Sequence, residues 1–245
     1  MSARRILATT RRVVEQLGHD PRTIALLLVV PSLLMGLLAW ILQSRPGAFD
    51  LFGPELLGIF PLIVMFLVTS VATLRERTSG TLERLLTLPL LKAEFVLGYA
   101  LSFGLASVVQ AALVSGLSFW VFGLHVQGSA WLISLIAVED ALLGTALGLS
   151  LSSLAATEFQ AVQFMPAFIL PQTLLCGLLV PRDQLPSALH WLSDVLPMSY
   201  AVDATHQISD YGTNSAHLAL DASVIFAFVI VALASGAATL RRRTR

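Results

Sequence analysis

The sequence predicts an all-α membrane protein with six transmembrane helices, an N-terminal amphipathic interfacial helix and short helices in two of the connections. Of its 245 residues, 56% are hydrophobic and only 12% are charged, whereas a soluble domain carries about 25% charged residues. The mean hydropathy is +0.80. A spanning helix needs roughly 20 apolar residues. Six runs meet or approach this length, at residues 24–42, 56–74, 95–122, 130–155, 162–180 and 218–240.

The basic residues predict which side of the membrane each connection faces. All but two of the 15 Lys and Arg residues lie before the first run, between the second and third, or after the sixth; the exceptions are Arg45 and Arg182. Because connections rich in Lys and Arg stay in the cytoplasm, we expect a multi-pass protein of the cytoplasmic (inner) membrane with both termini cytoplasmic. Interfacial tryptophans fit the expected outer ends, at Trp40, Trp120 and Trp131.

Residues 1–22 are too polar to cross the membrane and predict a basic amphipathic helix in the plane of its surface. Ile6, Val13 and Leu17 can share one helix face, with arginines on the others. Pro21 marks the end of this helix. A disordered basic tail is the alternative.

The connection at residues 75–92, here called the coupling segment, predicts a short cytoplasmic helix. Leu82, Leu85 and Leu86 follow i, i+3, i+4 spacing and form one apolar stripe, and Pro89 ends the helix. A helix of about two turns is marginal in water, so we expect it to dock on another protein. An ordinary charged loop is the alternative.

The stretch from Glu76 to Leu90 reads ERTSGTLERLLTLPL and resembles the signature of ABC-2 type permeases, the membrane subunits of a family of ATP-driven exporters. In that family an acidic residue is followed by Gly-Thr, Leu-Glu, a pair of leucines and a proline. Glu94 and Gly98 fit its positions at the start of the third span, and the resemblance extends over nearly the whole chain. It implies a coupling helix that docks on an ATPase subunit. This ATPase-coupling role carries over to Glu76, Gly80, Thr81, Leu82, Glu83, Arg84, Leu85, Leu86 and Pro89.

The resemblance also implies partners: a separate ABC ATPase (nucleotide-binding) subunit that holds ATP and Mg²⁺, a second permease subunit, identical or paralogous, and the lipid bilayer. The chain contains no G-x-x-x-x-G-K-[ST] motif, so we expect no enzymatic activity, catalytic residue or cofactor on it. Its net charge of zero argues against nucleic acid as a partner. One cysteine and scattered histidines argue against a metal site.

Three polar residues within the runs form a tentative translocation path: Gln110, Glu139 and Asp140. An acidic residue at the bilayer centre costs about 2.5–3.5 kcal/mol on insertion scales. Asp140 shares one helical stripe with Gly144 and Gly148, which lets another helix approach closely. Packing between helices without cargo contact is the alternative.

Residues 181–217 predict short interfacial or re-entrant helices on the outer side, because Leu185, Leu189 and Leu192 form an amphipathic stripe. A cap without a gating role is the alternative. The whole chain, residues 1–245, is expected to form a single ABC-2 type transmembrane domain.

By family analogy the expected function is export of an amphipathic drug, antibiotic or lipid, with polysaccharide export as an alternative within the family. An ion-driven transporter or channel that uses Glu139 and Asp140 as a proton site is the alternative outside it.

Overall fold

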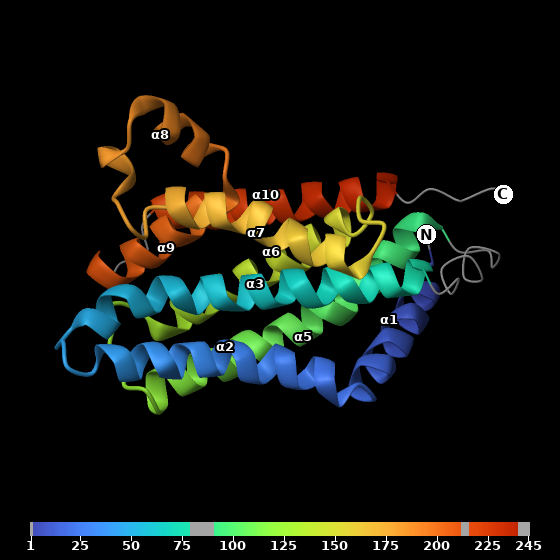
Figure 1. Cartoon of the computed structure of the whole chain (residues 1–245), viewed down its shortest axis with the longest axis horizontal. Coiled ribbons are helices and arrows are strands. Elements are labelled where there is room, and N and C mark those ends of the chain that lie inside the picture. Colours follow the sequence, from blue (N-terminus) through green and yellow to red (C-terminus); the bar gives the residue numbers. More distant parts are fainter. Residues whose placement is uncertain (1, 79–90, 212–215, 240–245) are drawn as a thin grey trace.

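The structure is a computed structural model that describes residues 2–78, 91–211 and 216–239, and every regular element in these ranges is helical. The long helices run side by side, and α1 crosses one end of the bundle (Figure 1). The elements are α1 (Ala3–Gly18), α2 (Pro21–Leu42), α3 (Ala48–Thr78), α5 (Lys92–Trp120), α6 (Ala130–Leu151), α7 (Glu158–Leu175), η1 (Arg182–Gln184), α8 (Ser187–Asp194), α9 (Pro197–Tyr211) and α10 (Ala216–Thr239).

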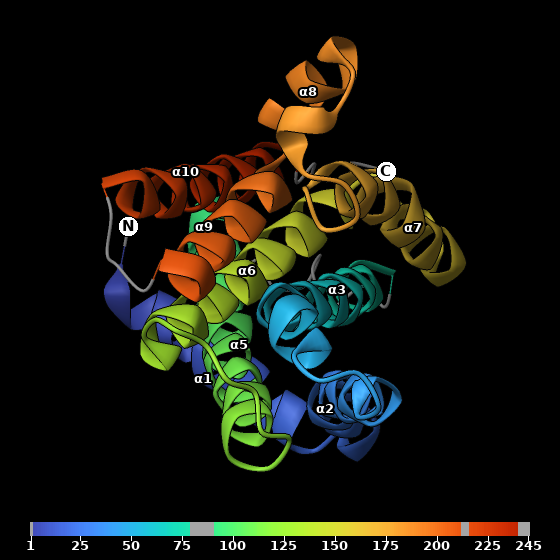
Figure 2. The same cartoon turned by 90° about the vertical axis from the view of Figure 1, so that its left-hand side faces the viewer.

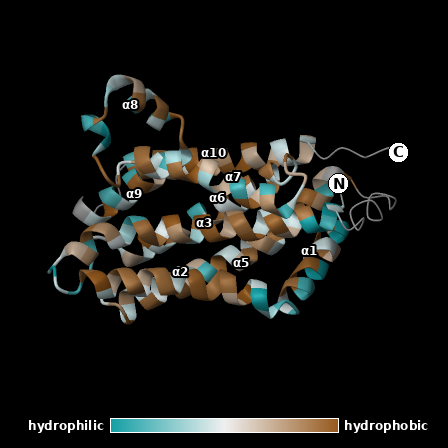
Figure 3. Cartoon of the chain, in the orientation of Figure 1, coloured by the Kyte–Doolittle hydropathy of each residue, from teal (hydrophilic) through white to brown (hydrophobic). Residues whose placement is uncertain are grey.

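Among the described residues, five helices are long and apolar enough to cross a membrane: α2, α3, α5, α6 and α10. Figure 3 shows hydrophobic residues along these helices and hydrophilic ones on α1 and at the ends of the bundle. The chain is therefore a multi-pass membrane protein, and five of the six expected spans are confirmed as helices of spanning length. The helix expected to continue to residue 155 ends at Leu151.

The sixth expected span, at residues 162–180, is not confirmed. Helix α7 occupies residues 158–175, has 18 residues and contains Pro166 and Pro171. Its three glutamines, Gln160, Gln163 and Gln172, lower its hydropathy below that of the five other long helices. Helix α7 nevertheless packs alongside α3, so a membrane crossing at α7 stays a prediction.

Helix α3 is the longest helix, with 31 residues. At 1.5 Å per residue it is about 46 Å long, whereas the hydrocarbon core of a bilayer is about 30 Å thick. Both of its ends therefore extend past the apolar layer. At its start, the Asp50 carboxylate accepts a hydrogen bond from the backbone N–H of His125 at 2.8 Å. This contact fixes the start of α3 to the connection between α5 and α6.

Helices α3 and α6 pack most extensively against each other and form the centre of the bundle (Figure 2). A Cβ atom added at Gly148 would lie 2.6 Å from the carbonyl oxygen of Phe66, and one at Gly144 would collide with the carbonyl oxygen of Leu62. The glycines predicted to allow close approach therefore lie where two backbones meet.

We expect Gly148→Ala to lower the free energy of unfolding in micelles by about 1 kcal/mol. The new methyl group forces the α3 and α6 backbones apart, which costs about 1–3 kcal/mol, and the better helix propensity of alanine offsets about 1 kcal/mol. Gly116→Ala is the matched control, because its added Cβ would meet only ordinary contacts of 3.6 Å with Trp120. Equal stability changes in the two variants would contradict this account.

The two ends of the bundle differ. The α1 end contains α1, the last turn of α3, the first turn of α5 and the last turn of α10, and the α9 end contains η1, α8 and α9 (Figure 1). Short helices were expected in residues 181–217, and η1, α8 and α9 lie there. Helix α8 projects away from the bundle in both views (Figures 1 and 2). A re-entrant position of these helices in the membrane stays a prediction.

Candidate functional site

The coupling segment connects α3 to α5 at the α1 end. Helix α3 continues through Arg75 and Glu76 to Thr78, and α5 begins at Lys92. Of the residues predicted to couple to an ATPase, Glu76 belongs to α3. The others lie outside the described residues: Gly80, Thr81, Leu82, Glu83, Arg84, Leu85, Leu86 and Pro89.

Glu76 is buried and joins α3 to α1 and α5. Its carboxylate lies 3.5 Å from Nη1 of Arg12, and Nη2 of Arg12 donates a hydrogen bond to the hydroxyl of Tyr99 at 2.7 Å. The same guanidinium lies over the ring of Tyr99, 5.8 Å from its centroid, a favourable cation–π position. Tyr99 is buried, so this contact holds three helices together where the coupling segment begins.

Glu94 joins α5 to α1 near the point where the coupling segment ends. Its side chain is fully buried, and its Oε1 accepts a hydrogen bond from the backbone N–H of Ser2 at 2.6 Å. Its Oε2 accepts the N–H of Leu91 at 3.0 Å and lies 3.7 Å from Nη1 of Arg5. Glu94 thus caps the first turn of α5 and binds the start of α1.

Gly98 allows α1 to lie directly on α5. A Cβ atom added there would lie 2.6 Å from the side chain of Thr9. Thr10 donates a hydrogen bond to the Gly98 carbonyl at 3.3 Å, and Ser102 donates one to the Thr10 carbonyl at 3.1 Å. We call the charged and aromatic contacts at this end the α1 cluster, which comprises Arg5, Arg12, Glu76, Glu94 and Tyr99.

Two further contacts hold the last turn of α3 against the region that follows α6. Arg75 pairs with Glu158 at the start of α7, with 2.8 Å between Nε and Oε1. Arg77 donates a hydrogen bond to the backbone carbonyl of Ser152. The end of α3 is therefore held by α1, α5, α7 and the connection after α6.

A cavity of about 380 Å³ lies beside the α1 cluster. Apolar side chains of α1, α2, α3 and α5 line it, and Asp20, Arg75, Glu76 and Glu158 provide polar groups. Asp20 caps α2, because its carboxylate accepts hydrogen bonds from the hydroxyl and the backbone N–H of Thr23. These bonds hold the pKa of Asp20 below its ordinary value.

The residues of the tentative translocation path have separate surroundings. Nε2 of Gln110 donates a hydrogen bond to the carbonyl of Leu27 at 2.8 Å, which joins α5 to α2. Asp140 is buried against Gly58 of α3, and Glu139 is half-buried. None of the three lines the cavity beside the α1 cluster. Their contact with cargo stays a prediction.

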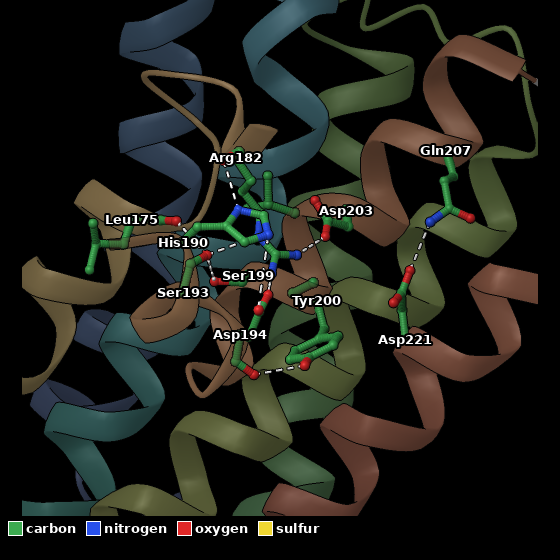
Figure 4. A network of polar contacts seen from close by, with 12 residues as sticks. Leu175, Arg182, His190, Ser193, Asp194, Ser199, Tyr200, Asp203, Gln207 and Asp221 are labelled. Atoms are coloured by element: carbon green, nitrogen blue, oxygen red, sulfur yellow. Dashed lines mark hydrogen bonds and ion pairs between the residues drawn. The ribbon is translucent and has the colours of Figure 1, made fainter. Parts of the chain in front are cut away.

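At the α9 end, Arg182 organises a second polar network (Figure 4). Its guanidinium pairs with Asp194 and Asp203, and its Nε donates to Oγ of Ser193 at 2.9 Å. It also lies 5.7 Å from the ring centroid of Tyr200. Burial raises the pKa of Asp203, and the positive charge of Arg182 opposes that shift. The network fixes η1, α8 and α9 relative to one another.

The sequence matches the family model described as ABC-2 type transporter over residues 4–208. The chain belongs to the ABC-2 type transporter family. The match includes the α1 cluster, the coupling segment and the Arg182 network.

Three individual relatives share 26–32% sequence identity with this chain. The chain is similar to a "Probable multidrug ABC transporter permease YbhR" of Escherichia coli K12, with 32% identity over 155 residues, 63% of this chain and 42% of the relative. It is also similar to "Linearmycin resistance permease protein LnrN" of Bacillus subtilis, with 26% identity over 186 residues, 75% of this chain and 48% of the relative. A third relative, "ABC transporter G family member 20" of Dictyostelium discoideum, shares 26% identity over 65% of this chain and 22% of its own length. The matches therefore span less than half of each of these relatives.

Sequence reasoning missed the part that α1 plays at this end of the ABC-2 chain. It placed α1 on the membrane surface and did not connect it to the coupling segment. The available signal was the spacing of Arg5 and Arg12, which are seven residues apart and so lie on one helix face. That face meets Glu76 and Glu94, the two glutamates that flank residues 79–90.

Proposed function

We propose that this chain is the permease subunit of an ATP-driven exporter and that its coupling segment docks on a separate ATPase subunit that binds ATP and Mg²⁺. The match to the ABC-2 type transporter family over residues 4–208 carries this proposal, because the matched region contains the coupling segment. Relatives that are themselves called permeases support a transport role for the chain.

The α1 cluster suggests how motion of the ATPase reaches the membrane. A displacement of the coupling segment acts on the last turn of α3 and the first turn of α5. Because Glu76 and Glu94 both contact arginines of α1, these turns and α1 move together. Helix α3 packs along α6, so the displacement continues into the centre of the bundle. ATP binding thereby biases the chain between two packed states.

The exposed surface fits a lipid environment and a second permease subunit. Helices α2 and α10 bury only a minority of their apolar residues inside the chain. Three tryptophans are at least two-thirds exposed at the α9 end of the long helices, as interfacial residues are: Trp40, Trp120 and Trp131. With the positive-inside rule, the α1 end and both termini face the cytoplasm of a cell whose inner membrane holds the protein.

We propose an amphipathic cargo, such as a drug, an antibiotic or a lipid. The words "multidrug" and "Linearmycin resistance" in the names of relatives support this class. The cavity beside the α1 cluster supports it too, since a mostly apolar lining with a few polar groups suits an amphipathic molecule. Polysaccharide export is the second candidate cargo within the family.

Reversing two charges of the coupling segment tests the proposal. We expect Glu83→Lys together with Arg84→Glu to reduce co-purification of the ATPase subunit about tenfold and to abolish ATP-dependent export from proteoliposomes. The control reverses an exposed charge at the opposite end, Arg45→Glu, and keeps both co-purification of the ATPase subunit and export. Unchanged assembly and export in the coupling variant would contradict the proposal. Uptake driven by a proton gradient without nucleotide would instead favour the ion-driven alternative.

A further inference from the structure

A second cavity, of about 620 Å³, lies at the α9 end between the start of α3, the connection after α7, and helices α9 and α10. Four carboxylates line it, and they face a single guanidinium, that of Arg182. The carboxylates are those of Glu55, Asp183, Asp203 and Asp221. Its volume falls within the roughly 300–1,000 Å³ range of ligand pockets.

Glu55 of α3 lines this cavity with an incompletely paired carboxylate. The residue is 4% exposed. Its Oε1 lies 3.0 Å from Nε2 of His206, and among the residues that the structure describes its Oε2 has no hydrogen-bond partner. Burying a charged oxygen without a partner is costly, so such groups are paired in most proteins. Oε2 of Glu55 is therefore a buried acceptor at the cavity wall, and a donor that reached it by a small side-chain movement would satisfy it.

The guanidinium of Arg182 does not neutralise the whole cavity, because Asp194 and Asp203 both pair with it. Asp221 of α10 is buried, and its Oδ2 accepts a hydrogen bond from the neutral amide of Gln207 at 2.8 Å (Figure 4). Within the described part of the chain, neither Glu55 nor Asp221 forms an ion pair with Lys or Arg. His206 and His217 also line the cavity, so its lining has four carboxylates against three basic side chains, and acidic groups stay in excess even when both histidines are protonated.

The surroundings of these carboxylates favour an organic cation over a metal ion. In the ranges that the structure describes, no three His, Cys, Asp or Glu side chains are close enough to hold a metal. Apolar side chains lie beside the carboxylates, at Leu51, Phe52 and Leu178. An ammonium group can donate to one or two carboxylates while a hydrocarbon body contacts the apolar side chains.

We propose that this cavity binds the protonated amine of an amphipathic organic cation, with Glu55 and Asp221 as the groups that recognise the charge. Binding of an organic cation in this cavity does not require the proposed export function. Only the identification of that cation as the exported cargo rests on it. Because the cavity lies at the end opposite the coupling segment, the ligand would occupy it after crossing the bundle.

Binding is tested on the full-length chain in lipid nanodiscs, without ATP or an ATPase subunit. The probes are dansylcadaverine, which carries a protonated primary amine, and its N-acetyl derivative, which has no charge. We expect the amine to bind at least tenfold more tightly than the acetylated compound. We expect Glu55→Gln to weaken amine binding about tenfold, equivalent to about 1.4 kcal/mol, and to leave binding of the acetylated compound unchanged.

Asp221→Asn is the second variant, because asparagine retains an oxygen that accepts the hydrogen bond of Gln207. It should also weaken only amine binding, with an unchanged melting temperature that shows the fold is intact. Glu15→Gln removes an exposed carboxylate that pairs with Arg11 on α1 and should have no effect. Equal affinity for the two probes, or an equal loss in Glu15→Gln, would overturn the inference. A failed ATPase co-purification with intact amine binding would overturn the proposed function alone.

Discussion

Replacing Arg182 with alanine is expected to lower the free energy of unfolding by about 2–4 kcal/mol. This is less than the cost of breaking a fully buried ion pair, because the side chains of Asp194 and Asp203 are 42% and 34% exposed and water screens part of the interaction. The side chain of Arg182 is 14% exposed and contacts two carboxylates. Its loss leaves Asp203 and Asp194 as like charges without a cation between them. It also removes the hydrogen bond to Ser193, whose own hydroxyl donates to the carbonyl of Leu175 at 2.8 Å.

The effect is measured by denaturant titration of the purified chain in micelles, with Arg45→Ala as the control. Arg45 is the other arginine on the predicted outer side and is exposed, so its removal should change stability by less than about 0.5 kcal/mol. Arg182→Lys should restore part of the loss, because an ammonium group cannot match the fork of a guanidinium. A loss below about 1 kcal/mol in Arg182→Ala would contradict a structural role for this network.

Replacing Arg12 with alanine is expected to cost about 1–3 kcal/mol, somewhat less than removing Arg182, because it breaks one ion pair instead of two. The pair with Glu76 is asymmetric: the Glu76 side chain is 7% exposed, but that of Arg12 is 34% exposed, so water screens part of the interaction. The substitution also removes the hydrogen bond to Tyr99. We expect faster hydrogen exchange along α1, because this helix loses a main contact with α3 and α5.

Arg11→Ala is a closely matched control for this prediction. Arg11 precedes Arg12 on the same helix, but it points to solvent and pairs with Glu15 in an i, i+4 surface contact at 2.7 Å. Such exposed pairs contribute little to stability. Similar exchange rates in the two variants would show that the α1 cluster does not hold α1 in place.

Hydropathy predicted much of this fold because each long apolar run must form a helix in a membrane. It placed α2, α3, α5, α6 and α10 to within a few residues at most of their ends. It predicted the start of α3 eight residues too late, since Asp50 and Glu55 interrupt the apolar run there and only the folded chain provides their partners. The same method predicted a span at residues 162–180, whereas α7 begins four residues earlier and ends five residues earlier, and its glutamines and prolines make it less apolar than the five other long helices.

The candidate sites were harder to predict because their contacts join residues far apart in the sequence. The ABC-2 resemblance identified Glu76, Glu94 and Gly98, but it did not indicate that all three meet α1. The sequence singled out Arg182 only as one of two basic residues outside the predicted cytoplasmic connections. In the structure its charge lies between two aspartates on short helices, an arrangement that no local periodicity encodes.

The continuity of α3 also constrains how this chain can change in evolution. Glu55 and Glu76 belong to one unbroken helix and are about 32 Å apart along its axis. Inserting or deleting one residue between them rotates one carboxylate by about 100° relative to the other. Either Glu55 would leave His206 or Glu76 would leave Arg12. Apolar substitutions on the outer surface of this span should be tolerated, whereas a single-residue change in its length should not.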